Sequence, residues 1–324
     1  MATCADSVRP IPGLEPSLCN ELPADASIMR RIFYWGFIPS AVVIFYVTQS
    51  IWTIIAAVII AERIYPRDPS FNVSIGKQTW KRGVIQLGKD SLWQVLLRVD
   101  DFAIAALVTI ESSIIDRVRV QYGIQILPAS WPTPLRIALF AFLVECAAYW
   151  PHRLAHNWKP LWSVHVVHHS VRRLTWLSGS ARFHPIELVL FNVIQSGVLV
   201  ASGATSQEFF WVMSLNAVAG VIVHANICVA APVLNWVFVD PYHHWIHHSQ
   251  DMGDSRTNYC CFIILVDRLF GTYRDHPKDL TLGIKGHEPP GIIAELFLPL
   301  VRTVAPNYLR ANPIAPDVQD RLSQ

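Results

Sequence analysis

The chain has 324 residues, of which 52% are hydrophobic and only 15% are charged, and its mean hydropathy is +0.33. Soluble domains carry about 25% charged residues, so this deficit and the 12 tryptophans predict an integral membrane protein. The net charge of +2 and the absence of a basic patch interleaved with aromatic residues exclude nucleic acid as an expected partner.

The N-terminal segment, residues 1–31, is rich in proline and small residues and is predicted to be a flexible tail. It has no apolar region of the kind found in a cleaved signal peptide. An uncharged run follows from Ile32 to Ala61, which is longer than the roughly 20 residues that span a bilayer. We expect this run to form one tilted span, or one span that starts at the interface.

Two segments of different character follow. Residues 83–115 have a helical pattern that charged residues interrupt, so we expect an amphipathic helix on the membrane surface, with a buried span as the alternative. A second, short helix is predicted from Leu135 to about Trp150. It contains Glu145, and a carboxylate in an apolar helix is usually functional. Glu145 is interpreted as an acceptor for the spare N–H of a ligating histidine, with a solvated helix-end carboxylate as the alternative.

Residues 186–203 and 207–231 are apolar and are separated by G-A-T-S-Q, which predicts a transmembrane hairpin. If the helix before Trp150 brings His152 to one membrane face, the hairpin leaves that face after His184 and returns to it near His224. The histidine-rich segments would then all lie at one face, where they could form one shared site.

Eleven of the 13 histidines lie between residues 152 and 248. Eight of them form one H-x-x-x-H and two H-x-x-H-H motifs: His152, His156, His165, His168, His169, His244, His247 and His248. At these spacings the histidines of one motif share a helix face. One metal ion takes three or four protein ligands, so this set is too large for one ion and about right for two. His276 and His287 are interpreted as ordinary histidines outside the site.

Imidazole is a good ligand for iron, zinc, copper and nickel. The chain has no H-E-x-x-H, G-x-S-x-G, G-x-G-x-x-G or E-x-x-H motif. Its six cysteines form no C-x-x-C pair and are expected to be reduced, so the metal site would consist of nitrogen ligands.

Two iron ions with O2 could oxidise an unactivated C–H bond of a lipid, and an apolar setting would suit that reaction. Zinc fits the same ligands but has no redox chemistry, and it would imply a membrane hydrolase with no obvious general base. Haem bound by paired histidines is a further alternative, but it leaves the repeated H-x-x-H-H motifs unexplained.

The motifs H-R-L-A-H at 152–156, H-V-V-H-H at 165–169 and H-W-I-H-H at 244–248 resemble the three histidine boxes of the membrane-bound fatty acid hydroxylase/sterol desaturase superfamily. The stretches R-F-H-P-I-E and 258–272 are also similar to segments of that family. The resemblance covers about residues 135–275, within a single membrane-embedded oxidase domain expected at 32–324. It implies an all-α integral membrane protein with about four transmembrane helices and a histidine-rich catalytic cap at the membrane surface.

The resemblance also implies non-haem di-iron, O2-dependent oxidation of a lipid, sterol or fatty-acyl substrate by hydroxylation or desaturation. Ether lipid cleavage of the alkylglycerol monooxygenase type is an alternative, because His243-His244 before W-I-H-H resembles that branch. The eight motif histidines would be metal ligands, and His224 would be a ninth. His184 is expected either to contact the ligand histidines without binding the metal or to be an optional ligand. His243 is expected near the ligands or in solvent.

The chain departs from the usual family pattern at Cys260, Val266 and Glu145, which leaves the substrate open and the box histidines unaffected. Glu145, Asn258 and Asp267 are expected to orient ligand imidazoles. Electrons would come from an external donor, either a cytochrome b5 or ferredoxin type protein or a reduced pterin. We expect the protein in the bacterial inner membrane or the endoplasmic reticulum, with the active site on the cytoplasmic face.

Overall fold

The computed structural model describes residues 28–48, 50–64, 117, 121–123, 125–172, 174–227, 229, 234–277, 280–284 and 297. Within these residues the regular elements are helices, and β-structure is limited to one isolated bridge between Ser249 and Leu282. The expected helical fold class is therefore confirmed for the described part. The predicted N-terminal tail is described only at its last residues, and the helix predicted in 83–115 lies outside the described residues.

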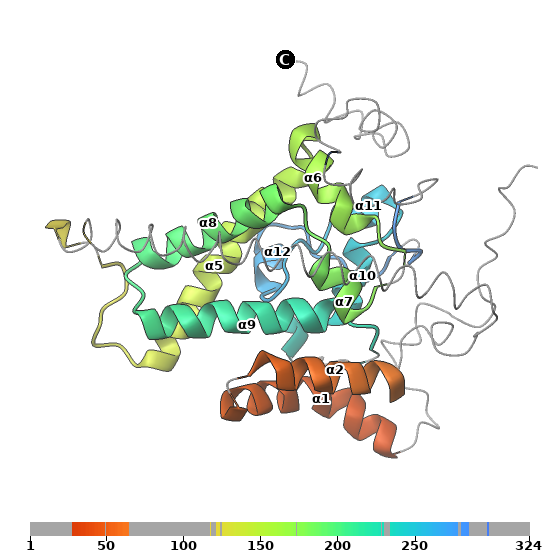
Figure 1. Cartoon of the computed structure of the whole chain (residues 1–324), viewed down its shortest axis with the longest axis horizontal. Helices are drawn as coiled ribbons and strands as arrows, with labels where there is room; N and C mark the ends of the chain where they lie inside the picture. Colours follow the sequence, from red (N-terminus) through yellow and green to blue (C-terminus); the bar gives the residue numbers. More distant parts are fainter. Residues whose placement is uncertain are drawn as a thin grey trace, which may run out of the picture.

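Three long helices form the centre of the molecule: α5 (Thr133–Ala155), α8 (Pro185–Ala201) and α9 (Ser206–His224). α5 packs along α8 and also contacts α9, as Figure 1 shows. The core between them contains Phe140, Val144, Leu199 and Val212. α5 and α9 are long and apolar enough to cross a membrane, and α8 is apolar but shorter.

α5 extends past the predicted end at Trp150 because Pro151 does not break it. A proline removes one backbone hydrogen bond and usually ends or kinks a helix. Here the last turn continues to Ala155 and is packed against α6 (Lys159–His169). This extra turn carries His152 into the site.

The predicted hairpin is present, but its second helix ends at His224 instead of continuing to residue 231. The connection uses Gly203 at φ 83°, a conformation that favours glycine. Thr205 caps α9, and the buried Glu208 side chain pairs with Arg136 of α5 at 2.8 Å. This end of the three helices is fixed by polar contacts.

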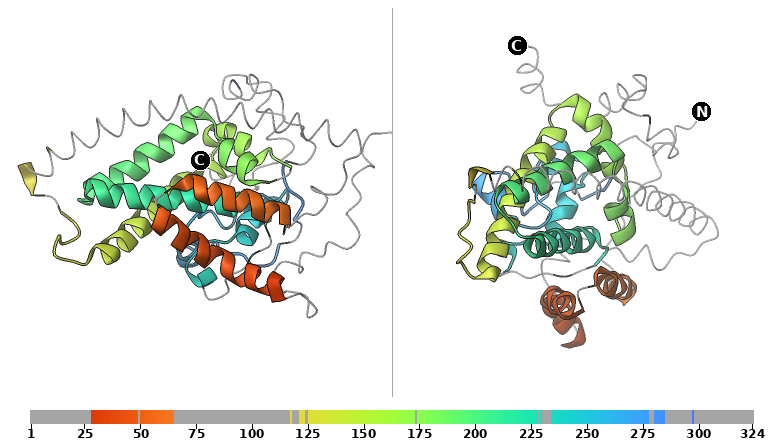
Figure 2. Two further views of the ribbon diagram at one scale, coloured as in Figure 1. Left: turned by 60° about the horizontal axis from the view of Figure 1, so that its bottom comes forward. Right: turned by 60° about the vertical axis from the view of Figure 1, so that its left-hand side comes forward.

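The uncharged run Ile32–Ala61 forms two helices, α1 (Ile28–Thr48) and α2 (Ile51–Ile64), so the prediction of one span is wrong. Hydroxyl groups take up backbone and side-chain hydrogen bonds at the break: Thr48 Oγ1 lies 2.8 Å from the Ile44 carbonyl oxygen and 2.9 Å from Thr53 Oγ1. Figures 1 and 2 show the two helices side by side next to α9.

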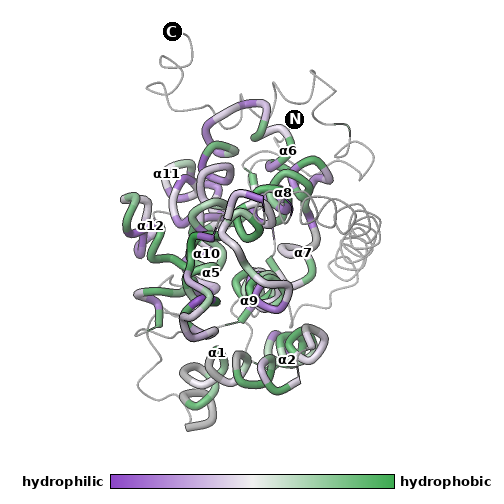
Figure 3. The backbone as a smooth tube through the Cα atoms, turned by 90° about the vertical axis from the view of Figure 1, so that its left-hand side faces the viewer, coloured by the Kyte–Doolittle hydropathy of each residue, from purple (hydrophilic) through white to green (hydrophobic). Residues whose placement is uncertain are grey.

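Short helices surround the C-terminal end of α5. They are α6, α7 (Trp176–Ala181), η2 (Leu234–Trp236), α10 (Pro241–His247), α11 (Met252–Ser255) and α12 (Leu265–Leu269). Hydrophobic residues run along α2, α8 and α9, while hydrophilic residues are more frequent around α6 and α11 (Figure 3). The histidines lie on the side of these short helices.

Candidate metal centre

The helix ends bring the three histidine motifs together. His152 lies in the last turn of α5 and His156 caps it, while His224 is the last residue of α9. α6 carries the second motif and α10 carries the third, with His248 as its C-cap. All nine histidines predicted as ligands fall into two buried groups, and the structure brings these groups together at one end of the hairpin.

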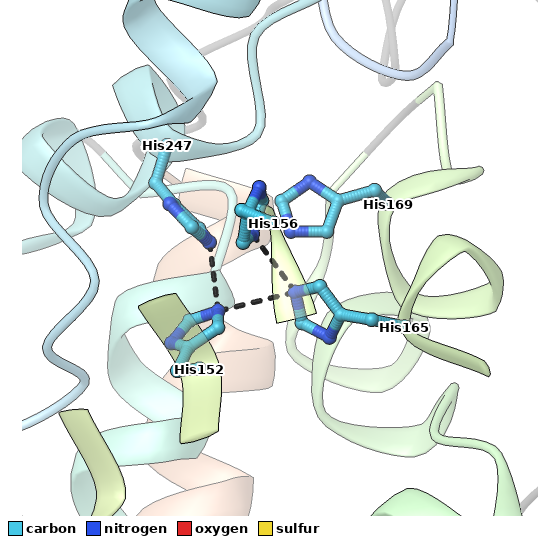
Figure 4. Close-up of side chains that lie close together, drawn as sticks. All are labelled: His152, His156, His165, His169 and His247. Atoms are coloured by element: carbon cyan, nitrogen blue, oxygen red, sulfur yellow. Dashed lines mark hydrogen bonds between the residues drawn. The ribbon is translucent and has the colours of Figure 1, made fainter. Parts of the chain in front are cut away.

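The first group, called here the five-histidine cluster, consists of His152, His156, His165, His169 and His247. One nitrogen from each ring lies within 4.8 Å of the others. The Nε2 atom of His165 is 3.1 Å from that of His152 and 3.0 Å from that of His156. The Nε2 atom of His247 lies 3.0 Å from that of His152, as Figure 4 shows.

The second group, called here the four-histidine cluster, consists of His168, His224, His244 and His248. The Nε2 atom of His224 is 3.3 Å from that of His168 and 2.9 Å from that of His244. The Nε2 atoms of His244 and His248 lie 3.2 Å apart. Four nitrogens thus converge on one point, which is the ligand number of a single metal site.

The two clusters are direct neighbours. The rings of His169 and His248, one from each cluster, stack with centroids 4.4 Å apart and an interplanar angle of 21°. His165 and His168, again one from each, have centroids 5.5 Å apart. Two metal ions, one in each cluster, would therefore be close neighbours.

The surroundings of His168, His169 and His247 favour their neutral form. Burial lowers the pKa of His168 and His169 well below the usual range, and the neighbouring imidazoles lower it further. Burial, with His165 nearby, lowers the pKa of His247 to about 3. Neutral imidazole is the form that binds metal, and a purely imidazole donor set suits iron, zinc, copper or nickel. The residues fit two such ions.

Several rings are oriented through their second nitrogen. His152 Nδ1–H donates to the Tyr259 carbonyl oxygen at 2.5 Å, and His247 Nδ1–H donates to the Thr257 carbonyl oxygen at 2.8 Å. His224 Nδ1–H donates within α9 to the carbonyl oxygen of Gly220 at 2.6 Å. Such hydrogen bonds fix the tautomer and leave Nε2 for the metal.

Glu187 was not among the predicted site residues, yet its buried carboxylate accepts a short hydrogen bond from His165 Nδ1. Glu187 is part of the R-F-H-P-I-E stretch, but His184 was the residue of this stretch that the sequence singled out as a candidate. His184 belongs to neither cluster, and its Nδ1 caps α8 by accepting the N–H of Ile186 at 3.2 Å. Glu187, one turn further, is the residue of this stretch that contacts a cluster histidine.

The three polar residues expected to orient imidazoles bind backbone instead. Asp267 accepts hydrogen bonds from the N–H groups of Tyr259 and Cys260, both at 2.9 Å. Glu145 accepts from the next two N–H groups along the chain, at 2.9 and 3.2 Å. Asn258 has φ 51° and donates to the His243 carbonyl oxygen at 3.0 Å. These side chains fix the 257–262 segment, whose carbonyl groups hold His152 and His247.

His243 lies outside both clusters although it is buried next to His244. Its Nδ1–H donates to Asp240 at 2.8 Å, and its Nε2 faces the Tyr273 hydroxyl at 3.0 Å and Asp275 at 3.2 Å. Burial disfavours its charged form, but the two carboxylates outweigh burial and raise the pKa of His243 to about 9. A protonated ring is not a metal ligand.

Gly179 of α7 permits the close approach of α7 to α9. A Cβ atom at this position would lie 2.4 Å from the Cβ of His224. Real side chains never approach so closely, so only glycine allows this packing. Sequence reasoning missed Gly179, because nothing local in the sequence marks this glycine as a contact of His224.

An apolar cavity of about 770 Å³ opens beside the clusters. His152, His165, His168 and His224 lie in its wall. The remaining walls come from α2, α5, α7, α8, α9 and the 257–262 segment, with Trp52 and Phe191 among their residues. A long apolar molecule in this cavity would lie directly against the candidate metal ligands.

The fold and site define a helical protein with a buried, all-histidine candidate site for two metal ions. Residues 137–272, which contain the three histidine motifs, match the fatty acid hydroxylase family model. This match agrees with the resemblance that the three histidine motifs indicate.

Several curated proteins are similar to the chain. The ornithine lipid hydroxylase OlsE of Rhizobium tropici is 32% identical over 54% of this chain and 53% of its own length. The Delta(7)-sterol-C5(6)-desaturase of Nicotiana tabacum is 29% identical over 43% of this chain and 49% of its own. The human alkylglycerol monooxygenase is 25% identical over 44% and 32%.

The chain spans about half the length, or less, of these curated relatives. No solved structure matches the chain. The names of the relatives share one kind of chemistry, since a hydroxylase, a desaturase and a monooxygenase are all oxidative enzymes, so the comparisons support an oxidative enzyme.

Proposed function

We propose that the protein is a non-haem di-iron oxidoreductase that uses O2 to oxidise a C–H bond of a membrane lipid. The observation that carries this proposal is the pair of adjacent, buried all-imidazole clusters in the wall of one apolar cavity. A hydrolytic zinc site would need a general base, and the two carboxylates beside the clusters, Glu145 and Glu187, are engaged with backbone N–H groups and with His165.

When bound, two iron ions would supply the redox chemistry of O2 reduction. For hydroxylation, the substrate C–H, O2, two electrons and two protons yield a C–OH group and one water molecule. In a desaturation, the same O2, electrons and protons yield two water molecules while the substrate loses two hydrogen atoms and gains a C=C bond. The two electrons would come from an external donor, a cytochrome b5 or ferredoxin type protein or a reduced pterin.

The residues of the chain have separate tasks in this proposal. The nine cluster histidines would bind the ions, and the 257–262 segment and Glu187 keep three of these rings oriented. The apolar walls bind the lipid and exclude water, which protects a strong oxidant from side reactions. Phe183 stacks on His168 with centroids 4.4 Å apart and covers the cavity side of that ring.

The membrane placement follows from the same arrangement. α5 and α9 would span the bilayer, with α8 and the α1–α2 pair packed beside them. The short helices with the histidines would form a cap at the cytoplasmic surface. A lipid would then enter the cavity from the bilayer between the long helices.

The decisive test is metal analysis and Mössbauer spectroscopy of protein purified anaerobically from iron-enriched cells. We expect about two coupled iron ions per chain, and loss of iron and turnover in His168→Ala and His247→Ala while the protein remains in the membrane. His276→Ala is the matched control, because His276 is exposed and belongs to neither cluster. Zinc alone, with no O2 consumption after iron reconstitution, would overturn the proposal in favour of a hydrolase.

A further inference from the structure

Three carboxamide side chains line the mainly apolar cavity away from the histidines. Asn192 and Gln195 come from α8, and Asn216 comes from α9. They share a helix face with apolar lining residues, since Leu188, Asn192 and Gln195 follow the spacing of one helix face. Amides on apolar helices are costly unless they meet a polar partner, so the cavity is built to receive something besides a hydrocarbon chain.

Gln195 and Asn216 have hydrogen-bonding groups that no described residue uses. Asn192 donates one hydrogen bond to the Leu188 carbonyl oxygen at 2.8 Å. Gln195 and Asn216, both partly exposed to the cavity, make no side-chain hydrogen bond to another residue in the part of the chain that the structure describes. Each carboxamide offers both donors and an acceptor. Together they match a group that both donates and accepts.

Both amides lie on the side of the cavity that is nearer the turn of the hairpin. Gln195 is eight residues after Glu187, the partner of His165, and Asn216 is eight residues before His224. At a rise of about 1.5 Å per residue, Gln195 is about 12 Å along α8 from Glu187, and Asn216 is about 12 Å along α9 from His224. The two helices run in opposite directions, so both amides are displaced to the same side of the clusters.

We infer that Gln195 and Asn216 bind a hydroxyl or secondary amide group of the lipid about 12 Å from the metal clusters, and so set which carbon is oxidised. This inference rests on the proposed function for the reaction, but the binding step is independent of it. The substrate class is a lipid whose chain carries a group that both donates and accepts hydrogen bonds. An ester or an ether only accepts, and a hydrocarbon does neither.

Binding of four probes to the full-length protein in detergent tests the inference. The probes share one chain length: 1-hexadecanol, N-methylhexadecanamide, methyl hexadecanoate and hexadecane. We expect the alcohol, the amide or both to bind roughly tenfold more tightly than hexadecane, as two hydrogen bonds would give. Whichever of the two binds more tightly identifies the group. Equal binding of all four probes overturns the inference.

The double variant Gln195→Leu/Asn216→Leu should lose this preference while its iron content stays at the wild-type level. Met213→Leu is the matched control, because Met213 lines the same cavity, and the control should keep the preference. An unchanged preference in the double variant overturns the inference. Probe selectivity without O2-dependent oxidation would instead count against the proposed function alone.

The products provide a second readout. Alcohols of 14, 16 and 18 carbons should be oxidised at a constant distance from the hydroxyl group, because the amides hold that end. Oxidation at a constant distance from the methyl end would show that the chain terminus positions the substrate, and would overturn the assignment of Gln195 and Asn216.

Discussion

At the scale of single residues, the orientation of each ring depends on what its second nitrogen contacts. His165 is the central ring of the five-histidine cluster, since its Nε2 approaches those of both His152 and His156. Its other nitrogen contacts Glu187. Among the described residues, Glu187 is the only carboxylate that orients a cluster ring in this way, because the other partners are backbone carbonyl oxygens. Glu187 therefore controls a ring on which the rest of its cluster depends.

We expect Glu187→Ala to weaken metal affinity about 10- to 100-fold, the usual effect of removing such a partner. Glu187→Gln is the matched control and should lie between this variant and wild type, because its carbonyl oxygen can still accept from His165. Competition with a metal chelator measures the affinity. Wild-type affinity in the alanine variant would show that Glu187 does not orient His165.

Gly179 offers a second test at this scale. Gly179→Ala forces a Cβ atom against His224, and overpacking of this kind costs about 1–3 kcal/mol. We expect the variant to lose iron from the four-histidine cluster and to retain it in the five-histidine cluster, as read by metal analysis and Mössbauer spectra.

Gly197→Ala is the matched control, because nothing lies within 4 Å of a Cβ placed there on α8. Alanine favours helix over glycine by about 1 kcal/mol, so this variant should keep its metal and be slightly more stable. If both variants bound the same amount of iron, Gly179 would have no special role at His224.

At the scale of elements, the 257–262 segment supplies two carbonyl groups to cluster histidines, and three polar side chains hold that segment in place. Asp267 alone accepts from two backbone N–H groups and from Thr272 Oγ1 at 2.7 Å. Burial raises the pKa of Asp267, and these hydrogen bonds to its carboxylate oppose that effect. The Asp267 carboxylate therefore fixes the backbone that in turn positions the His152 and His247 rings.

Asp267→Ala should lower the free energy of unfolding by at least about 2 kcal/mol, because it leaves buried N–H groups without acceptors, and it should also lower metal content. Thr205→Val is the control: it removes the cap of α9 at the opposite end and costs about 1 kcal/mol. Thermal unfolding and iron analysis separate the two effects. Lost metal in the control, or full metal in Asp267→Ala, would contradict this role.

Much of this arrangement could be predicted from the sequence, because local patterns carry it. The spacing of the motif histidines and the apolar hairpin predicted one histidine site, and the structure brings the nine candidate ligands together. Pro151 misled because local propensity argues for a helix end while tertiary packing continues the helix. The break after Thr48 was missed because apolar residues flank it on both sides.

The remaining features depend on contacts between distant residues. The Asp267 and Glu145 carboxylates were recognised as important, but only the folded chain shows that their partners are backbone N–H groups of the 257–262 segment. Likewise, the contact of Glu187 with His165 spans 22 residues and follows from where α6 and α8 meet. No periodicity or spacing contains that information.

At the scale of the whole molecule, α2 is tied to the site through one buried carboxylate. Glu62 accepts hydrogen bonds from the N–H groups of Trp176 at 2.9 Å and Asn226 at 2.8 Å. These residues begin α7 and follow the end of α9. The N-terminal helices therefore contact the same two elements that position His224.

Removal of the proposed metal should loosen this whole assembly, because the ions would join α5, α6, α9 and α10. Ligand binding to the folded state adds about 2.7 kcal/mol at a free metal concentration 100 times the Kd. We expect anaerobic chelation to lower the unfolding temperature and re-addition of Fe(II) to restore it. Identical unfolding temperatures with and without metal would show that the clusters do not bind ions that stabilise the fold.

His152 and His247 are neighbours although they are 95 residues apart in the chain. This separation has a consequence for when the clusters can form during synthesis. Both clusters need α10, which the ribosome makes after the long helices, so neither cluster can be complete while the nascent chain ends at α9. On the proposed function, iron would then bind in one of the last steps of biogenesis, after the long helices have entered the membrane. A cell short of iron would accumulate inserted but unmetallated protein, a population that quality control could recognise.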